Sequence, residues 1–167
     1  KKDIKNKGAY FMKVLQSSHE KHHWYKLVFI CIISINQRIS IFMAIVTIEN
    51  KKEAKILRKK TADFDFSKYS KSDLRKLVQA MKQTMKDADG IGLSANQVGL
   101  DLNFFVAEVN GKFYAIFNPK IEKQSSETEE TEEGCLSVPA TYGIVRRAEK
   151  VTINAFDING KKIKIKA

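Results

Sequence analysis

Two Asn-Gly dipeptides constrain the fold of this chain more than any other feature. Asn110-Gly111 separates NFFVAEV from KFYAIFNP, and Asn159-Gly160 separates VTINAFDI from KKIKIK. Asn-Gly favours a type I′ turn, whose twist matches that of two antiparallel strands. We therefore predict two antiparallel hairpins with type I′ turns. Pro119 is expected to end the second strand of the first hairpin, because proline cannot donate to a sheet ladder.

One strong helix is predicted upstream of these hairpins, over residues 70 to 89. Its apolar residues recur at helical spacing, namely Leu74, Leu77, Val78, Met81, Met85 and Ala88. Ser70 and Asp73 resemble a capping box at its start, and Gly90 provides a stop. A helix followed by hairpins predicts an α+β fold with antiparallel β-sheets packed on a central helix.

The composition changes at about residue 43. The chain has 167 residues, of which 43% are hydrophobic, and this length suits one well-filled core. Residues 1–43 hold eight Lys/Arg and two acidic residues, so this quarter carries +6 of the formal net charge of +11. We predict a basic leader over residues 1–42 and one domain over residues 43–167. No basic run is interleaved with aromatic residues, so specific nucleic-acid binding is not expected.

The cysteines and the apolar segments limit the compartment. Cys31 and Cys135 are the two cysteines, which gives no disulfide framework and favours a reducing environment. The longest apolar run, LVFICIISI, has nine residues and is too short to span a bilayer, so no transmembrane segment is expected. We predict a cytoplasmic location, with organelle targeting by the leader as the alternative. Residues 122–134, with six glutamates, are predicted to form a solvated loop.

Two short motifs are candidates for chemistry, GIGLSANQ (residues 90–97) and EEGCLS (residues 132–137). The two glycines of the first motif permit positive φ and close backbone approach, so this loop is expected to lie against a ligand. A helix stop followed by a turn is the commoner meaning of such glycines. Gln97 offers an amide that does not titrate and that suits an oxyanion. Cys135 is a candidate metal ligand or nucleophile, and the plainer alternative is a small buried hydrophobe.

All three histidines lie in HEKHH, residues 19–23. In a helix, His19 and His23 would share one face with Glu20 beside them, which is the spacing of two metal ligands and a general base. Together with Cys135 they would form a three-ligand site with a fourth position open to water. The alternative is an accidental polar cluster in the leader.

GIGLSANQ, EEGCLS and the later segment VRRAEKVTINAFDINGKKIKIKA resemble the peptide deformylase family. These metal-dependent amidases remove the formyl group from the N-terminal methionine of nascent chains. The resemblance runs from about Met43 to Ala167. It implies a deformylase-like fold, one divalent ion, Fe(II) or Zn(II), and formyl-Met nascent peptides as substrate. Contact between the basic leader and the ribosome surface is a further expectation, through attraction to phosphates.

The resemblance also implies roles for the motif residues. Gln97 and the backbone N–H of Leu136 would hold the oxyanion, and Cys135 would bind the metal. A set of loop residues is expected to lie against the substrate: Gly90, Ile91, Gly92 and Gly134.

The family's third motif, HExxH, lies on a helix after the last hairpin, and the matching part of this chain stops at Ala167. The leader segment KGAYFMKVLQSSHEKHHWYK resembles that helix, so we expect it to supply the motif from the front, as in a circular permutant. His19 and His23 would then bind the metal, and Glu20 would act as general acid/base. The segment differs from the family at the inserted residues 17–18 and at His22, where aspartate is usual.

Two other functions stay open. The chain is alternatively a truncated or non-catalytic deformylase-like module that binds peptides or ribosomes with an incomplete metal site. A cysteine-nucleophile hydrolase using Cys135 and a histidine is the third alternative. Flanking glutamates disfavour thiolate formation and so count against that third function.

Overall fold

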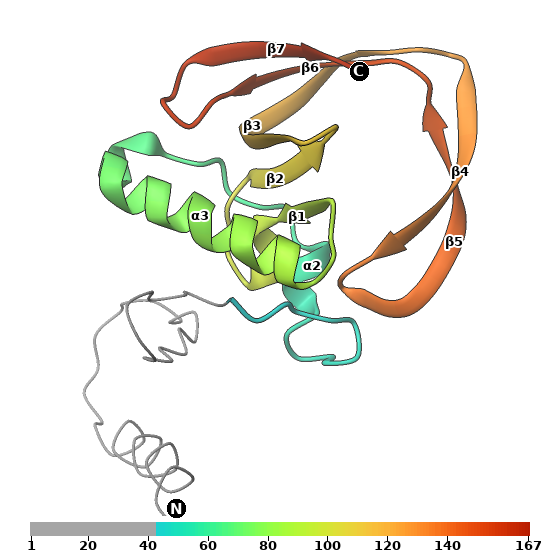
Figure 1. Ribbon diagram of the computed structural model, residues 1–167, viewed down its shortest axis with the longest axis horizontal. Helices are drawn as coiled ribbons and strands as arrows, with labels where there is room; N and C mark the ends of the chain where they lie inside the picture. The colour runs from blue at the N-terminus through green and yellow to red at the C-terminus, as the bar shows by residue number, and fades with distance from the viewer. Residues whose placement is uncertain (1–42) are drawn as a thin grey trace, which may run out of the picture.

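The computed structural model describes residues 43–167 (Figure 1). The apolar run at residues 27–35 and the HEKHH stretch at residues 19–23 lie outside the described residues, so the predictions made for them stay predictions. The described elements follow one another as α2 (Lys55–Arg58), η1 (Phe66–Lys68), α3 (Lys71–Asp87), β1 (Gly92–Ser94), η2 (Ala95–Val98), β2 (Phe104–Val109), β3 (Lys112–Gln124), β4 (Thr128–Cys135), β5 (Val138–Ala148), β6 (Val151–Phe156) and β7 (Lys162–Lys166).

The strands form two antiparallel sheets. Five of them pair in the order β1-β2-β3-β6-β7, while β4 and β5 pair with each other. Figure 1 shows α3 lying along the five-stranded sheet and the β4–β5 ribbon curving away from it as a separate arm. The predicted α+β class, antiparallel sheets with a helix packed on them, is confirmed. No helix in the described part of the chain has the length and apolar character needed to cross a membrane.

Helix α3 begins as the sequence predicts and ends by a different device. The Ser70 hydroxyl accepts from the Asp73 N–H at 3.1 Å, which caps the first turn. At the other end Asp89 adopts φ 53°, and the N–H groups of Asp89 and Gly90 donate to the carbonyls of Lys86 and Met85. This is a Schellman stop with aspartate in the left-handed position. The glycines at residues 90 and 92 do not adopt the positive φ that glycine permits.

The hydrophobic core lies between α3 and one face of the five-stranded sheet. Met81 and Met85 of α3 are fully buried against Leu93, Val106 and Phe117 of the sheet. Each such side chain contributes roughly 1.5–3 kcal/mol through burial. The opposite sheet face has its own apolar rows, because side chains alternate along a strand. Its directly paired apolar rows are Phe105–Ile116 and Ile121–Ile153–Ile165.

The first hairpin is confirmed, but its second strand is longer than predicted. Asn110 and Gly111 both have positive φ, as a type I′ turn requires. Pro119 does not end β3, which runs on to Gln124. The register shifts between Phe117 and Lys120, and Asn118 has φ 48° at this irregularity. A bulge leaves its extra residue outside the ladder, so proline is accommodated inside the strand without losing a hydrogen bond.

The second hairpin is also confirmed, and its turn type differs from the prediction. Gly160 has φ 74°, whereas Asn159 is not among the described residues with positive φ. The Gly160 N–H donates to the Asp157 carbonyl, and the Asp157 N–H donates to the Lys161 carbonyl. The loop therefore holds three residues with a left-handed glycine at its end. Asp157 selects this turn, because its carboxylate also accepts from the N–H groups of Asn159 and Lys161.

The prediction of a solvated loop over the glutamate-rich residues is wrong. Residues 122–124 belong to β3, and residues 128–135 form β4, which pairs with β5 from Thr128 to Cys135. The glutamates nevertheless face solvent, because a two-stranded ribbon that projects from the body leaves both faces exposed. Arg146 and Arg147 of β5 pair with Glu130 and Glu133 at 2.6 and 2.7 Å, so cross-strand charge pairs offset the low strand propensity of glutamate.

Candidate functional site

Cys135 lies at the point where the β4–β5 ribbon turns back on itself. It is the last residue of β4 and pairs with Val138, the first residue of β5, so Leu136 and Ser137 form a tight turn between them. The register shifts between Gly134 and Cys135, which sets this turn apart from the regular ladder. The thiol is exposed, whereas Ser137 is only 3% exposed. The Cys135 thiol is thus accessible for chemistry, and the alternative of a buried hydrophobe is wrong.

Gln97 projects from η2, the short helix that follows β1. Its Oε1 accepts from the Ser94 N–H at 2.9 Å, which ties the side chain back to the end of β1. The helix stops at Gly99, whose φ of 79° is left-handed. The contact with Ser94 thus orients the Gln97 amide through residues that are close in the chain, without help from distant segments.

The two motifs meet through the amide of Gln97. Its Nε2 donates to the Ser137 hydroxyl at 3.1 Å and lies 3.7 Å from the Cys135 Sγ. A glutamine Nε2 carries two N–H groups, so one can serve Ser137 while the other points toward the thiol. The structure therefore brings Gln97 and Cys135 together although 38 residues separate them in the sequence.

A backbone segment with no distinctive sequence pattern holds both turns. The Val46 N–H donates to the Gln97 carbonyl at 2.8 Å, and the Ile48 N–H donates to the Ser137 carbonyl at 2.9 Å. Alternate N–H groups of one extended segment thus reach the two sides of the site. No side-chain pattern signals this segment, because the hydrogen bonds come from its backbone.

The glycines of the site act through close packing. A Cβ at Gly90 would lie 2.7 Å from Leu136 Cδ1, so the helix stop sits directly against the turn that carries Cys135. A Cβ at Gly134 would lie 2.8 Å from the Tyr142 ring, which crosses the strand at that point. Ile91 is 81% exposed beside these residues. Gly92 starts β1 with only ordinary contacts at its missing Cβ.

Glu133, the acidic residue next to the site, forms an ion pair with Arg147. Hydrogen bonding from the Arg147 guanidinium lowers the pKa of Glu133, and the same pair raises the pKa of Arg147. Glu133 therefore stays ionised at neutral pH two residues before Cys135. Its charge is largely matched by Arg147, which limits its repulsion of a thiolate.

The donor set for a metal is incomplete within the described residues. Cys135 supplies a soft sulfur ligand of the kind that Zn(II) and Fe(II) accept. In residues 43–167 no group of three His, Cys, Asp or Glu side chains is placed to hold an ion. Cys135 thus fits one ligand position of such a metal site. The other predicted ligands, His19 and His23, and the predicted general acid/base Glu20 lie outside the described residues.

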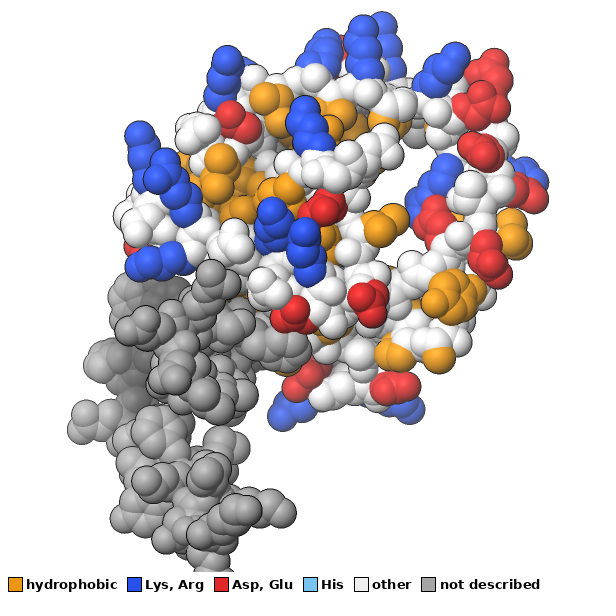
Figure 2. All heavy atoms as spheres, viewed as in Figure 1, with side chains coloured by type: hydrophobic (Ala, Val, Ile, Leu, Met, Phe, Trp, Pro, Cys, Tyr) orange, Lys and Arg blue, Asp and Glu red, His pale blue; other side chains and the backbone are white. Residues whose placement is uncertain are grey.

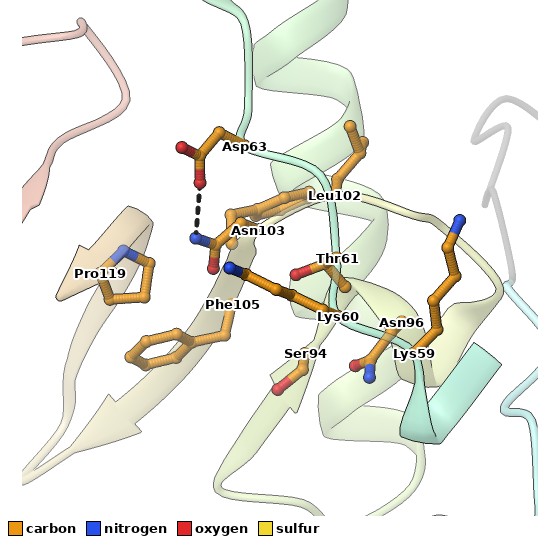
Figure 3. Close-up of a pocket in the computed structure, with 11 residues that line it drawn as sticks. Lys59, Lys60, Thr61, Asp63, Ser94, Asn96, Leu102, Asn103, Phe105 and Pro119 are labelled. Carbon is orange, nitrogen blue, oxygen red and sulfur yellow. Dashed lines mark hydrogen bonds between the residues drawn. The ribbon is translucent and has the colours of Figure 1, made fainter.

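A separate hollow of about 420 Å³ opens on the sheet face opposite α3 (Figure 3). Ser94, Phe105 and Pro119 line it from the sheet, and Lys60 and Asn103 line it from neighbouring segments. Figure 3 shows the Asn103 amide turned to Asp63, with which it forms a hydrogen bond of 3.1 Å. Ser94 connects this hollow to the site, because its N–H binds the Gln97 side chain.

The fold and these contacts define an α+β domain in which an amide and an exposed thiol converge from two turns. The family model for polypeptide deformylase matches residues 42–167, and the chain belongs to the peptide deformylase family. It is 41% identical over 128 residues to the peptide deformylase of Symbiobacterium thermophilum, with 75% of this chain and 57% of that protein covered. The peptide deformylase 2 of Gloeobacter violaceus is 42% identical over 100 residues, with 57% of this chain and 54% of that protein covered.

Solved structures give the same result. A class I type b peptide deformylase from Acinetobacter baumannii superimposes with a TM-score of 0.70 at 27% identity, over 77% of this chain and 84% of that one. Peptide deformylase 1B of Arabidopsis thaliana gives a TM-score of 0.66 at 38% identity, over 75% of this chain and 68% of that one. The chain spans about half the length of the curated relatives it matches.

Proposed function

We propose that this chain hydrolyses the N-formyl group from the N-terminal formylmethionine of nascent peptides. Membership of the deformylase family supports the reaction class. The observation that carries the proposal is the convergence of the Gln97 amide and the Cys135 thiol, because the reaction needs an oxyanion donor beside a metal ligand.

In the proposed reaction, Gln97 and Leu136 stabilise the charge that develops on the formyl oxygen. The second N–H of Gln97 Nε2 is directed to the side of Cys135, and the backbone N–H of Leu136 begins the adjacent turn. Ser137 and Ser94 hold the amide in place through hydrogen bonds at 3.1 and 2.9 Å, so it is preorganised before substrate binds. Preorganised donors of this kind contribute roughly two to three decades of rate each.

A divalent ion, iron(II) or zinc, would supply the activated water when bound. Cys135 would hold it together with His19 and His23, and Glu20 would carry the proton from the water to the leaving amine. The substrate would lie along Gly90, Ile91, Gly92 and Gly134, where the exposed Ile91 offers apolar surface to the methionine side chain. In this arrangement residues 1–42 complete the site of the domain at residues 43–167. The cytoplasmic location and the contact with ribosomes stay predictions.

The test combines formate release from a formyl-Met peptide with metal analysis of the purified chain. Cys135→Ala is expected to abolish both bound metal and turnover, whereas the matched control Cys31→Ala should keep both. His19→Ala and His23→Ala should each lower metal content. Full metal occupancy in Cys135→Ala would end the proposal.

A specific observation supports a second candidate, a peptide-binding module without turnover. In the described part of the chain no group of three side chains that includes Cys135 could hold a metal ion. A peptide-binding module without a metal would therefore not require any residue of the leader. Binding of a formyl-Met peptide without formate release, unchanged in Glu20→Gln, would favour the module. Turnover that is lost in Glu20→Gln would favour the enzyme.

A further inference from the structure

A group of lysines gathers on one face of the sheet at its β6–β7 edge, away from the candidate site. We call it the lysine face, and it consists of Lys120, Lys123, Lys162, Lys164 and Lys166. All five side chains are exposed. Figure 2 shows basic side chains projecting along the edge of the molecule where Figure 1 places β6 and β7.

Strand register places these lysines in rows. Lys120 pairs with Asn154, and Asn154 pairs with Lys164, so the three share one row on one face. Lys123, Thr152 and Lys166 form the next row in the same way. Adjacent rows lie about 6.6 Å apart, because residues two apart on a strand share a face. These two rows thus form a grid of ammonium groups with a polar side chain at the middle of each, and Lys162 lies in a third row beside Phe156.

Only one acidic side chain lies on this grid. Glu122 contacts Lys164 at 2.9 Å, and a hydrogen bond from Lys164 is the main cause of its lowered pKa. No ion pair is formed by the other four lysines of the face within the described residues. The Asp157 carboxylate, at the nearby turn, accepts hydrogen bonds from the N–H groups of Asn159 and Lys161. The face therefore keeps a net positive charge in the folded protein.

We propose that the lysine face binds single-stranded RNA through its phosphates, without reading its sequence. Lysines contribute counterion release at each phosphate they neutralise. Asn154 and Thr152, between the lysines, are side chains that hydrogen-bond phosphate and sugar oxygens, including the RNA 2′-hydroxyl. An anionic membrane fits less well, because the isoleucines of these strands lie on the opposite face, in the row Ile121–Ile153–Ile165. Phe156, which shares a row with Lys162, packs against the core and is not free to enter a membrane. This surface goes beyond the proposed hydrolysis and does not depend on it.

The experiment measures the affinity of the full chain for a labelled oligouridylate as a function of salt concentration. The triple variant Lys162→Gln, Lys164→Gln, Lys166→Gln should bind more weakly. Its slope of log affinity against log salt should fall by about 2, since each single-strand phosphate contact contributes about 0.7. The matched control carries glutamine at the exposed residues Lys51, Lys52 and Lys55, which changes the net charge equally, and it should keep the wild-type slope.

A variant of opposite sign separates binding from folding. Glu122→Gln frees Lys164 and removes the one negative charge of the face, so it should tighten binding and raise the slope. Equal slopes for the triple variant and its control, or unchanged binding by Glu122→Gln, would overturn the proposal. Equal affinity for oligothymidylate would overturn the assignment to RNA. Loss of binding to phosphatidylglycerol vesicles with unchanged RNA binding would assign the face to membranes instead.

Discussion

Replacement of Gln97 should separate what its side chain does for stability from what it does for chemistry. Gln97→Ala removes the acceptor of the Ser94 N–H and the donor to the buried Ser137 hydroxyl. Two such neutral hydrogen bonds are worth about 0.5–1.5 kcal/mol each, so the variant should lose about 1–3 kcal/mol of unfolding free energy. At about 2–4 °C per kcal/mol for a chain of this size, its Tm should fall by about 2–12 °C.

Gln97→Glu is the matched comparison. Glutamate still accepts from the Ser94 N–H, and the Ser137 hydroxyl can rotate to donate to its second oxygen. The variant should therefore unfold within about 1 kcal/mol of the wild type. It has no N–H to offer an oxyanion, so its kcat for a formyl-Met peptide should fall by at least about a hundredfold.

Thermal unfolding followed by circular dichroism and a formate-release assay measure the two effects. The reasoning fails if Gln97→Glu unfolds as early as Gln97→Ala, because the Ser94 contact would then not hold the side chain. It also fails if Gln97→Glu keeps wild-type turnover, because the amide would then not be the oxyanion donor.

Three further predictions concern the support of the site. Gly90→Ala places a Cβ 2.7 Å from Leu136 Cδ1, which can rotate aside, and 3.3 Å from the Met85 carbonyl, which cannot, so it should lower the unfolding free energy by about 1 kcal/mol. Unfolding like the wild type would contradict this contact. Thr84→Val removes a buried hydroxyl that accepts from the Met43 N–H, so it should lower the free energy of unfolding in denaturant by about 1–3 kcal/mol, whereas Thr84→Ser should lower it less. Hydrogen bonding from Arg147 lowers the pKa of Glu133 from its ordinary value in the folded state, so the pair stabilises the fold at pH values above that ordinary value. That stabilisation is lost as the pH falls through the folded pKa, and the Tm difference between wild type and Glu133→Gln should vanish there.

The sequence by itself determined the elements that are stabilised by residues close together in the chain. The capping of α3 by Ser70 and the Asn110-Gly111 turn depend on residues adjacent in the chain, so both are confirmed. The turn at Asn159-Gly160 departs from the dipeptide rule because the Asp157 carboxylate closes a longer loop. The motif residues Gln97 and Cys135 were found for a similar reason, since each lies in a short and distinctive stretch.

The tertiary structure decided what depends on distant partners. Residues 128–135 form a strand because they pair with β5, whose Arg146 and Arg147 also form ion pairs with Glu130 and Glu133, and no window of the acidic sequence contains that partner strand. Pro119 lies inside β3 because a bulge against β6 removes the need for its N–H. The site itself depends on backbone N–H groups of Val46 and Ile48, which side-chain patterns do not reveal. Sequence thus determined which residues could do chemistry, and long-range hydrogen bonding decided that Gln97 and Cys135 face each other.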